Sequence, residues 1–157
     1  MADFGLSRKI KLVLITNGSL ADRPRVQQGL QKMAALNGEV WFKFDSATAG
    51  GMRSINQTRI APEKQFERLA AAARRCPTWL QTCWFAFDGA APDESEQSAY
   101  LNLLRTVGPK IKGVHLYGLA RPSLQPDAKR LGRLTADQLA AFAARIATLG
   151  IKVTLNP

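Results

Sequence analysis

The stretch KIKLVLITNGSL, residues 9–20, decides how the chain is interpreted, because an apolar run ends abruptly in small polar residues. The apolar part predicts a buried β-strand. It is followed by Thr16, Asn17, Gly18 and Ser19, which are typical of turns and helix caps but also present hydrogen-bonding groups at a strand end. What this ending means depends on whether other strands end in the same way.

Strand and helix patterns alternate along the rest of the sequence. Further strands are expected at 39–46, 78–89, 112–123 and 151–157. Apolar residues at helical spacing predict helices at 21–36 and in the segments that begin near 62, 93 and 135, and 47–62 is expected to be a long polar loop. Asp22 is the expected cap of the first helix, and Thr135 with Gln138 forms an expected capping box. Strict alternation indicates right-handed crossovers and a parallel sheet, so the fold class is α/β.

Several of these strands have one apolar and one polar face. In the second strand, Val40 and Phe42 alternate with Trp41 and Lys43, and the strands at 112–123 and 151–157 show the same pattern. Central strands of a doubly wound sheet are covered on both faces and are apolar throughout. A polar second face resembles the lining of a barrel that holds a ligand. We therefore expect a partial, parallel (β/α) barrel with five strands and four helices.

The polar strand ends answer the question that the first strand raises. In parallel α/β sheets and barrels, ligands bind at the carboxyl ends of the strands. Polar residues follow the other strands as well, namely Asp45 and Ser46, Asp88 and Gly89, Arg121, and Asn156. Each of them alone can be explained as a turn or cap residue. Together they predict a ligand cavity at one rim of the sheet.

Composition limits the class of protein. The chain has 157 residues, of which 46% are hydrophobic, and residues 1–157 are expected to form a single domain. No apolar run reaches the ~20 residues of a membrane span, and the opening MADFGLSRK does not resemble a signal peptide, so we expect a cytoplasmic protein without a membrane partner.

Charge and cysteine content leave alternatives open. A net charge of +10 favours an anionic ligand or nucleic acid, but scattered arginines are equally a solvated surface. Cys76 and Cys83 have neither zinc nor iron–sulfur spacing, and the chain has one histidine, so no metal site is expected. Both cysteines are expected to be reduced, with Cys83 as a small core residue. His115 is interpreted as a hydrogen-bonded wall residue.

Four stretches together resemble a known superfamily. KLVLITNGSL (11–20), VWFKFDSATAGGMRSINQTR (40–59), LQTCWFAFDG (80–89) and VHLYGLARPSLQP (114–126) resemble the later strands of radical S-adenosylmethionine (radical SAM) enzymes, in particular the Fe–S oxidoreductase-like branch. The resemblance covers nearly the whole chain. It implies a (β/α)6 barrel, of which this chain supplies the third strand onward, with S-adenosylmethionine and a [4Fe–4S] cluster as cofactors.

The sequence departs from that family at its defining motif. There is no CxxxCxxC segment and no GGE-type segment, so this chain alone does not ligate the cluster. Residues 1–8 resemble the end of a helix. These features predict the truncated, C-terminal part of a radical SAM enzyme that is inactive alone.

The resemblance also assigns provisional roles to individual residues. The expected cofactor-binding residues are Asn17, Ser19, Lys43, Asp45, Gln81 and Tyr117. The expected substrate-binding residues, suited to an anionic substrate, are Arg53, Asn56, Arg59 and Arg121. For the loop arginines a solvated surface remains the alternative.

A half-barrel would leave its first strand, Lys11–Ile15, as a long apolar edge. The expected partner for this edge is the missing half of the barrel or another copy of the chain. A second hypothesis, from a different class, is a non-enzymatic nucleotide- or RNA-binding protein on a partial α/β barrel.

Overall fold

The computed structural model describes residues 10–120, 124 and 126–156. The main sheet contains β1 (Leu12–Thr16), β2 (Gly38–Lys43), β3 (Thr78–Cys83), β5 (Gly113–Tyr117) and β7 (Val153–Asn156). All neighbouring pairs are parallel, and the spatial order β1-β2-β3-β5-β7 follows the order in the sequence. The α/β class and the five-stranded parallel sheet are therefore confirmed.

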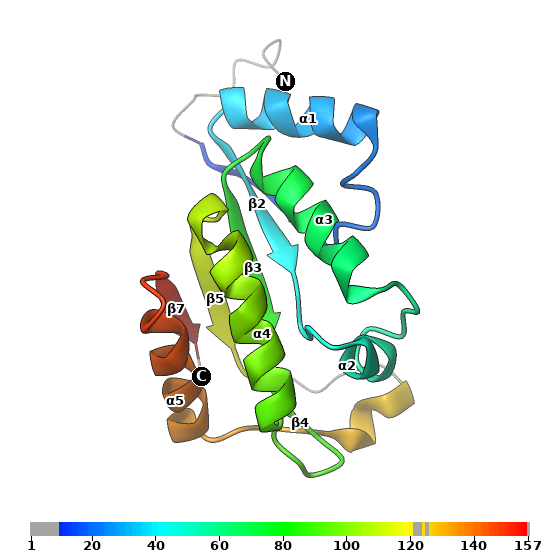
Figure 1. Cartoon of the computed structure of the whole chain (residues 1–157), viewed down its shortest axis with the longest axis vertical. Helices are drawn as coiled ribbons and strands as arrows, with labels where there is room; N and C mark the ends of the chain where they lie inside the picture. The colour runs from blue at the N-terminus through cyan, green and yellow to red at the C-terminus, as the bar shows by residue number, and fades with distance from the viewer. Residues whose placement is uncertain (1–9, 121–123, 125, 157) are drawn as a thin grey trace.

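The helices lie on one face of this sheet (Figure 1). They are α1 (Pro24–Ala35), α3 (Pro62–Ala73), α4 (Glu94–Val107) and α5 (Ala136–Ala147). A doubly wound sheet reverses its strand order and places helices on both faces. Here the order never reverses, so every crossover of the same hand returns over the same face. The result is a partial (β/α) barrel, as predicted.

The core lies between the sheet and this layer of helices. Val40, Phe42, Leu80, Val114 and Leu116 point from the strands into it, and each is 0% exposed. The helices contribute the apolar positions that helical spacing predicted, including Leu69, Tyr100, Leu104, Phe142 and Ile146. Burying a side chain of this size contributes about 1.5–3 kcal/mol, so this face supplies most of the stabilisation.

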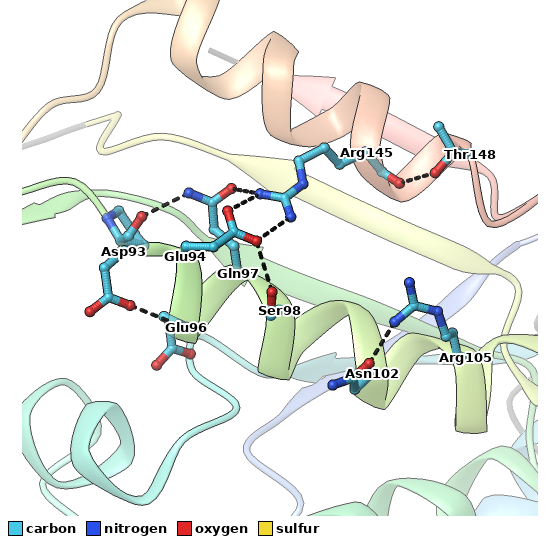
Figure 2. Close-up of polar contacts among 10 residues, drawn as sticks. Asp93, Glu94, Glu96, Gln97, Ser98, Asn102, Arg105, Arg145 and Thr148 are labelled. Carbon is cyan, nitrogen blue, oxygen red and sulfur yellow. Dashed lines mark hydrogen bonds and ion pairs between the residues drawn. The ribbon is translucent and has the colours of Figure 1, made fainter.

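The helix α4 is tied to α5 at the surface of the helix layer (Figure 2). The Arg145 guanidinium donates to both carboxylate oxygens of Glu94, at 2.6 and 2.8 Å, and to Gln97 Oε1 at 2.6 Å. Asp93 caps α4 by accepting from the Glu96 backbone N–H, at the position near 93 where the sequence predicted a helix to begin. The capping box of Thr135 and Gln138 on α5 is also confirmed.

Three local predictions were wrong. Arg23, without a side-chain cap, is the N-cap of α1, and Asp22 instead forms an ion pair with Lys64 of α3 at 3.3 Å. The predicted polar loop contains a fifth helix, α2 (Ala49–Ser54), which Thr48 caps by accepting from the Gly51 N–H.

The third error concerns the predicted strand 78–89, which is two strands in the structure. It breaks after β3, and β4 (Ala86–Phe87) pairs antiparallel with β6 (Leu131–Gly132) in a separate two-stranded sheet. Two 3-10 helices, η2 (Gly108–Lys110) and η3 (Pro126–Arg130), complete the described elements. The predicted helix tail at 1–8 lies outside the described residues.

Candidate functional site

A cavity of about 540 Å³ lies at the carboxyl ends of β1, β2 and β3, and we call it the rim cavity. Its polar lining includes residues from three strand ends and from the segment around α2, namely Asn17, Ser19, Lys43, Asp45, Ser46, Asn56, Gln57, Gln65 and Cys83. Its apolar lining includes Phe44, Met52, Ile55, Ile60, Phe85, Phe87 and Leu131. An apolar cavity with a few polar groups is typical of small-molecule sites, and its volume lies within their usual range.

The TNGS sequence forms a tight turn that brings β1 to this rim. The Gly18 N–H donates to Thr16 Oγ1 at 3.0 Å, and the Ser19 N–H donates to Asn17 Oδ1 at 3.1 Å. Gly18 has a φ of +71°, and a Cβ at this position would lie 2.1 Å from the Phe42 ring. The side chains of Thr16 and Asn17 and the backbone of Gly18 therefore stabilise the turn, and Asn17 and Ser19 also line the cavity.

Asp45 is the most constrained acidic group of the rim cavity. Its carboxylate accepts from the Cys83 backbone N–H at 2.9 Å and from the Asn56 amide at 3.3 Å. The residue is 7% exposed, and burial raises the pKa of its carboxyl above the ordinary value in spite of both donors. This carboxylate joins the end of β2 to β3 and to the loop after α2.

Cys83 lies beside Asp45 and lines the rim cavity, so it is not the enclosed core residue that we expected. It is half-buried, whereas Cys76 is buried, and both thiols are free. Burial, with the Asp45 charge adding to it, raises the pKa of Cys83 to about 12. The thiol therefore stays protonated near neutral pH, which excludes a thiolate nucleophile here.

One wall of the rim cavity comes from a segment far along the chain. The Arg130 guanidinium binds both carboxylate oxygens of Asp88, at 2.9 and 2.6 Å, and lies 4.1 Å from the centre of the Phe87 ring. This ion pair, together with the pairing of β4 with β6, fixes the position of η3 beside the carboxyl ends of the strands (Figure 1). It places Asp127 and Leu131 in the cavity lining.

The sheet face opposite the helices forms a second polar surface, which we call the open face. Trp41, Trp79 and His115 pack there as adjacent rings, with His115 4.4 Å from Trp79 and 4.7 Å from Trp41 between ring centres. His115 Nε2 and the Gln81 side-chain oxygen are buried without a hydrogen-bond partner among the described residues. Burial lowers the pKa of His115, so its imidazole is neutral at pH 7.

The structure brings together half of the predicted site residues. Asn17, Ser19, Lys43, Asp45 and Asn56 line the rim cavity. Gln81 and Tyr117 lie on the open face instead, although Gln81 is the register partner of Lys43. Arg53 and Arg59 line a different cavity, and Arg121 lies outside the described residues.

Sequence reasoning missed the aromatic wall of the rim cavity. Phe85, Phe87 and Leu131 line it, but only the pairing of β4 with β6 brings them there. The FAFD sequence was interpreted as a continuation of the third strand, and no local signal marks the break. Asp88 was expected at the rim, and the structure uses its carboxylate to bind Arg130.

No group of three or more potential metal ligands occurs among the residues that the structure describes. Within the same residues, no helix is both long and apolar enough to cross a membrane.

Comparison with known proteins supports the fold. No protein-family model and no curated protein sequence matches the chain. Among solved structures, it is similar to a radical SAM methyltransferase from Sphaerobacter thermophilus, with a TM-score of 0.64 and 13% sequence identity. The match covers 91% of this chain but only 39% of that chain. The similarity therefore shows that the α/β fold of this chain resembles part of that structure.

Proposed function

We propose that this chain is the C-terminal part of a radical SAM-like barrel, which contributes cofactor- and substrate-lining residues and is inactive alone. One observation carries the proposal. The described helices lie on one face of the sheet, and the other face carries Lys43, Gln81 and Tyr117 toward the position of a barrel interior. The similarity to 39% of a radical SAM methyltransferase and the four sequence stretches support it.

The residues present fit S-adenosylmethionine better than they fit a cluster. Lys43 is exposed and lines the rim cavity, where its ammonium group can bind a carboxylate. The Gln81 oxygen lacks a donor in the described part of the chain, and Tyr117 offers a ring for stacking on the same face. The [4Fe–4S] cluster does not fit, because Cys76 and Cys83 lie before and at the end of β3 and no third ligand accompanies either of them among the described residues. Another polypeptide would have to hold the cluster.

The edge strand β1 is where we propose that this polypeptide attaches. Val13, Leu14 and Ile15 are 41%, 37% and 54% exposed, and β1 pairs only with β2 in the described sheet. Exposed apolar edges of this kind pair with other strands. The proposed occupant is a strand from the rest of the barrel, and a second copy of this chain takes its place when the chain is alone.

Ligand titration tests the function. We expect calorimetry to show saturable binding of S-adenosylmethionine to the full chain, weakened by Lys43→Ala and by Gln81→Ala. Lys32→Ala, on the exposed side of α1, is the matched control and should bind as the wild type does. Anaerobic reconstitution should leave the chain alone without a stoichiometric cluster.

Two outcomes would contradict the proposal. A stoichiometric cluster bound by the chain alone would show that it holds the ligands that we assign to another polypeptide. RNA binding with a steep salt dependence, and no S-adenosylmethionine binding, would favour the non-enzymatic nucleotide- or RNA-binding protein instead.

Sedimentation tests the edge. We expect the wild-type chain to self-associate as its concentration rises, and Ile15→Lys to suppress this by placing a charge on the edge strand. Leu20→Lys is the control, because Leu20 is 56% exposed but lies outside β1. A wild-type chain that stays monomeric, or equal effects of the two substitutions, would exclude strand pairing at this edge.

A further inference from the structure

A second cavity, of about 760 Å³, lies between the helices and shares only Ile60 with the lining of the rim cavity. Its lining comes from both ends of α2, from residues 59–63 before and at the beginning of α3, and from one side of α4. Figure 1 shows α2 and α3 on the same side of α4. Because Arg53 and Arg59 both line it, we call it the arginine groove.

Neither arginine has a hydrogen bond or ion pair within the part of the chain that the structure describes. By contrast, Arg130 and Arg145 each bind both oxygens of a carboxylate. The groove is also lined by Glu63, but its carboxylate forms no ion pair with either guanidinium. Two like charges that line one groove repel each other, and an anion that contacts both removes this repulsion.

The rest of the groove is suited to an organic anion. Phe66, Ile60 and Leu103 supply apolar surface beside the arginines. The Phe66 ring is held in place by Phe44, at 5.7 Å between ring centres. On α4, the Asn102 side-chain oxygen accepts from Arg105, so its amide N–H groups remain available as donors. Charged donors, neutral donors and an aromatic surface therefore line the same space.

We propose that the arginine groove binds a small organic anion, a carboxylate or phosphate monoester, with its charged group between Arg53 and Arg59 and its apolar part against Phe66. Guanidinium groups bind both kinds of anion through paired N–H donors. The ligand enters between the helices, whereas the proposed cofactor lies at the rim and on the open face. The two arginines are among the substrate-binding residues that the resemblance implies, so the proposal deepens the proposed function; its test measures anion binding alone and does not require the cofactor to bind.

Amide chemical-shift titration of the full chain with phenyl phosphate, benzoate and benzamide tests the site. The first two probes separate phosphate from carboxylate as the preferred anion, and benzamide is the neutral counterpart of benzoate. We expect saturable shifts at α2, at residues 59–63 and on the groove side of α4 with at least one anion, and none with benzamide. Substitution of either arginine by glutamine should lower the affinity for the anion about tenfold, because it removes one charge-assisted hydrogen bond.

The matched variants are Arg53→Gln with Arg59→Gln, and Arg74→Gln as the control. Arg74 is exposed at the end of α3 and does not line the groove. Because all three side chains are exposed, we expect each variant to fold as the wild type does. Unchanged affinity in the double variant, equal shifts with benzamide, or no saturable shift with either anion would overturn the proposal.

Discussion

The two faces of the sheet differ in burial and in hydrogen bonding: apolar side chains are buried on one face, and the other face carries polar side chains without hydrogen-bond partners among the described residues. Leu80 on β3 points into the helix layer and is 0% exposed, whereas its neighbour Gln81 points to the open face with its side-chain oxygen unpartnered. The same contrast separates Leu116 from His115 on β5. The covered face buries its strand side chains against the helices of this chain, and the open face leaves two buried polar atoms of its strands without a partner among the described residues. The covered side of these strands thus carries the core, and the open side carries the polar groups of the proposed cofactor site.

The largest expected effect compares adjacent residues of β3. Leu80→Ala should lower the free energy of unfolding by about 3–5 kcal/mol, because it leaves a cavity in the covered core. Gln81→Ala should change it by less than about 1 kcal/mol, since it removes an oxygen that has no partner. Urea denaturation of the full chain measures both. Similar losses in the two variants would mean that the open face is as tightly packed as the covered face.

The second prediction concerns Gly18, in the turn after β1, which lies against the buried Phe42 ring. Gly18→Ala should cost about 2–4 kcal/mol, because it combines a left-handed backbone conformation with a methyl group that collides with the buried Phe42 ring. Gly89→Ala is the control, since Gly89 has a φ of +80° and nothing within 4 Å of the added Cβ. It should cost only about 1–2 kcal/mol, for the backbone alone. Equal losses in thermal or urea unfolding would show that Phe42 does not restrict the turn.

The smallest effect is expected at the outer surface of the helix layer. The Arg145 guanidinium lowers the pKa of Glu94 to about 2, so the stabilisation from this pair is complete above pH 4.5 and is lost as the pH falls toward 2. Glu94→Gln should therefore reduce the dependence of the melting temperature on pH between these values. Both side chains are exposed to solvent, so the change should be small beside that of Leu80→Ala.

The measurement is the melting temperature of Glu94→Gln and of Ser95→Ala between pH 2 and pH 4.5. Comparing the two variants separates the effect of the Glu94–Arg145 ion pair from the general effect of acid on the protein. Ser95 is exposed on the same turn of α4, whereas Arg145 contacts Glu94 and Gln97 there, so substitution of Ser95 should leave the pH dependence unchanged. An unchanged slope in Glu94→Gln would mean that the ion pair does not form in solution.

Local sequence patterns predicted the parts of the fold that depend on periodicity. Alternation along β2 separated Phe42 from Lys43, and helical spacing identified Tyr100 and Phe142 as core residues. These predictions succeeded because the repeat of a strand or helix fixes which side chains share a face. The short helix α2 was missed because AGGMRS contains two glycines and lacks an apolar stripe.

The sequence by itself determined the α/β class, the order of the elements, the two-faced strands and the polar strand ends. Only the tertiary structure decided which of those polar residues meet. It placed Asn56 in the rim cavity and Arg53 in the arginine groove, although they are three residues apart in the sequence, and it brought Leu131 beside Phe87. The physical reason is that periodicity acts within one element, whereas a cavity is formed by packing between elements far apart in the chain.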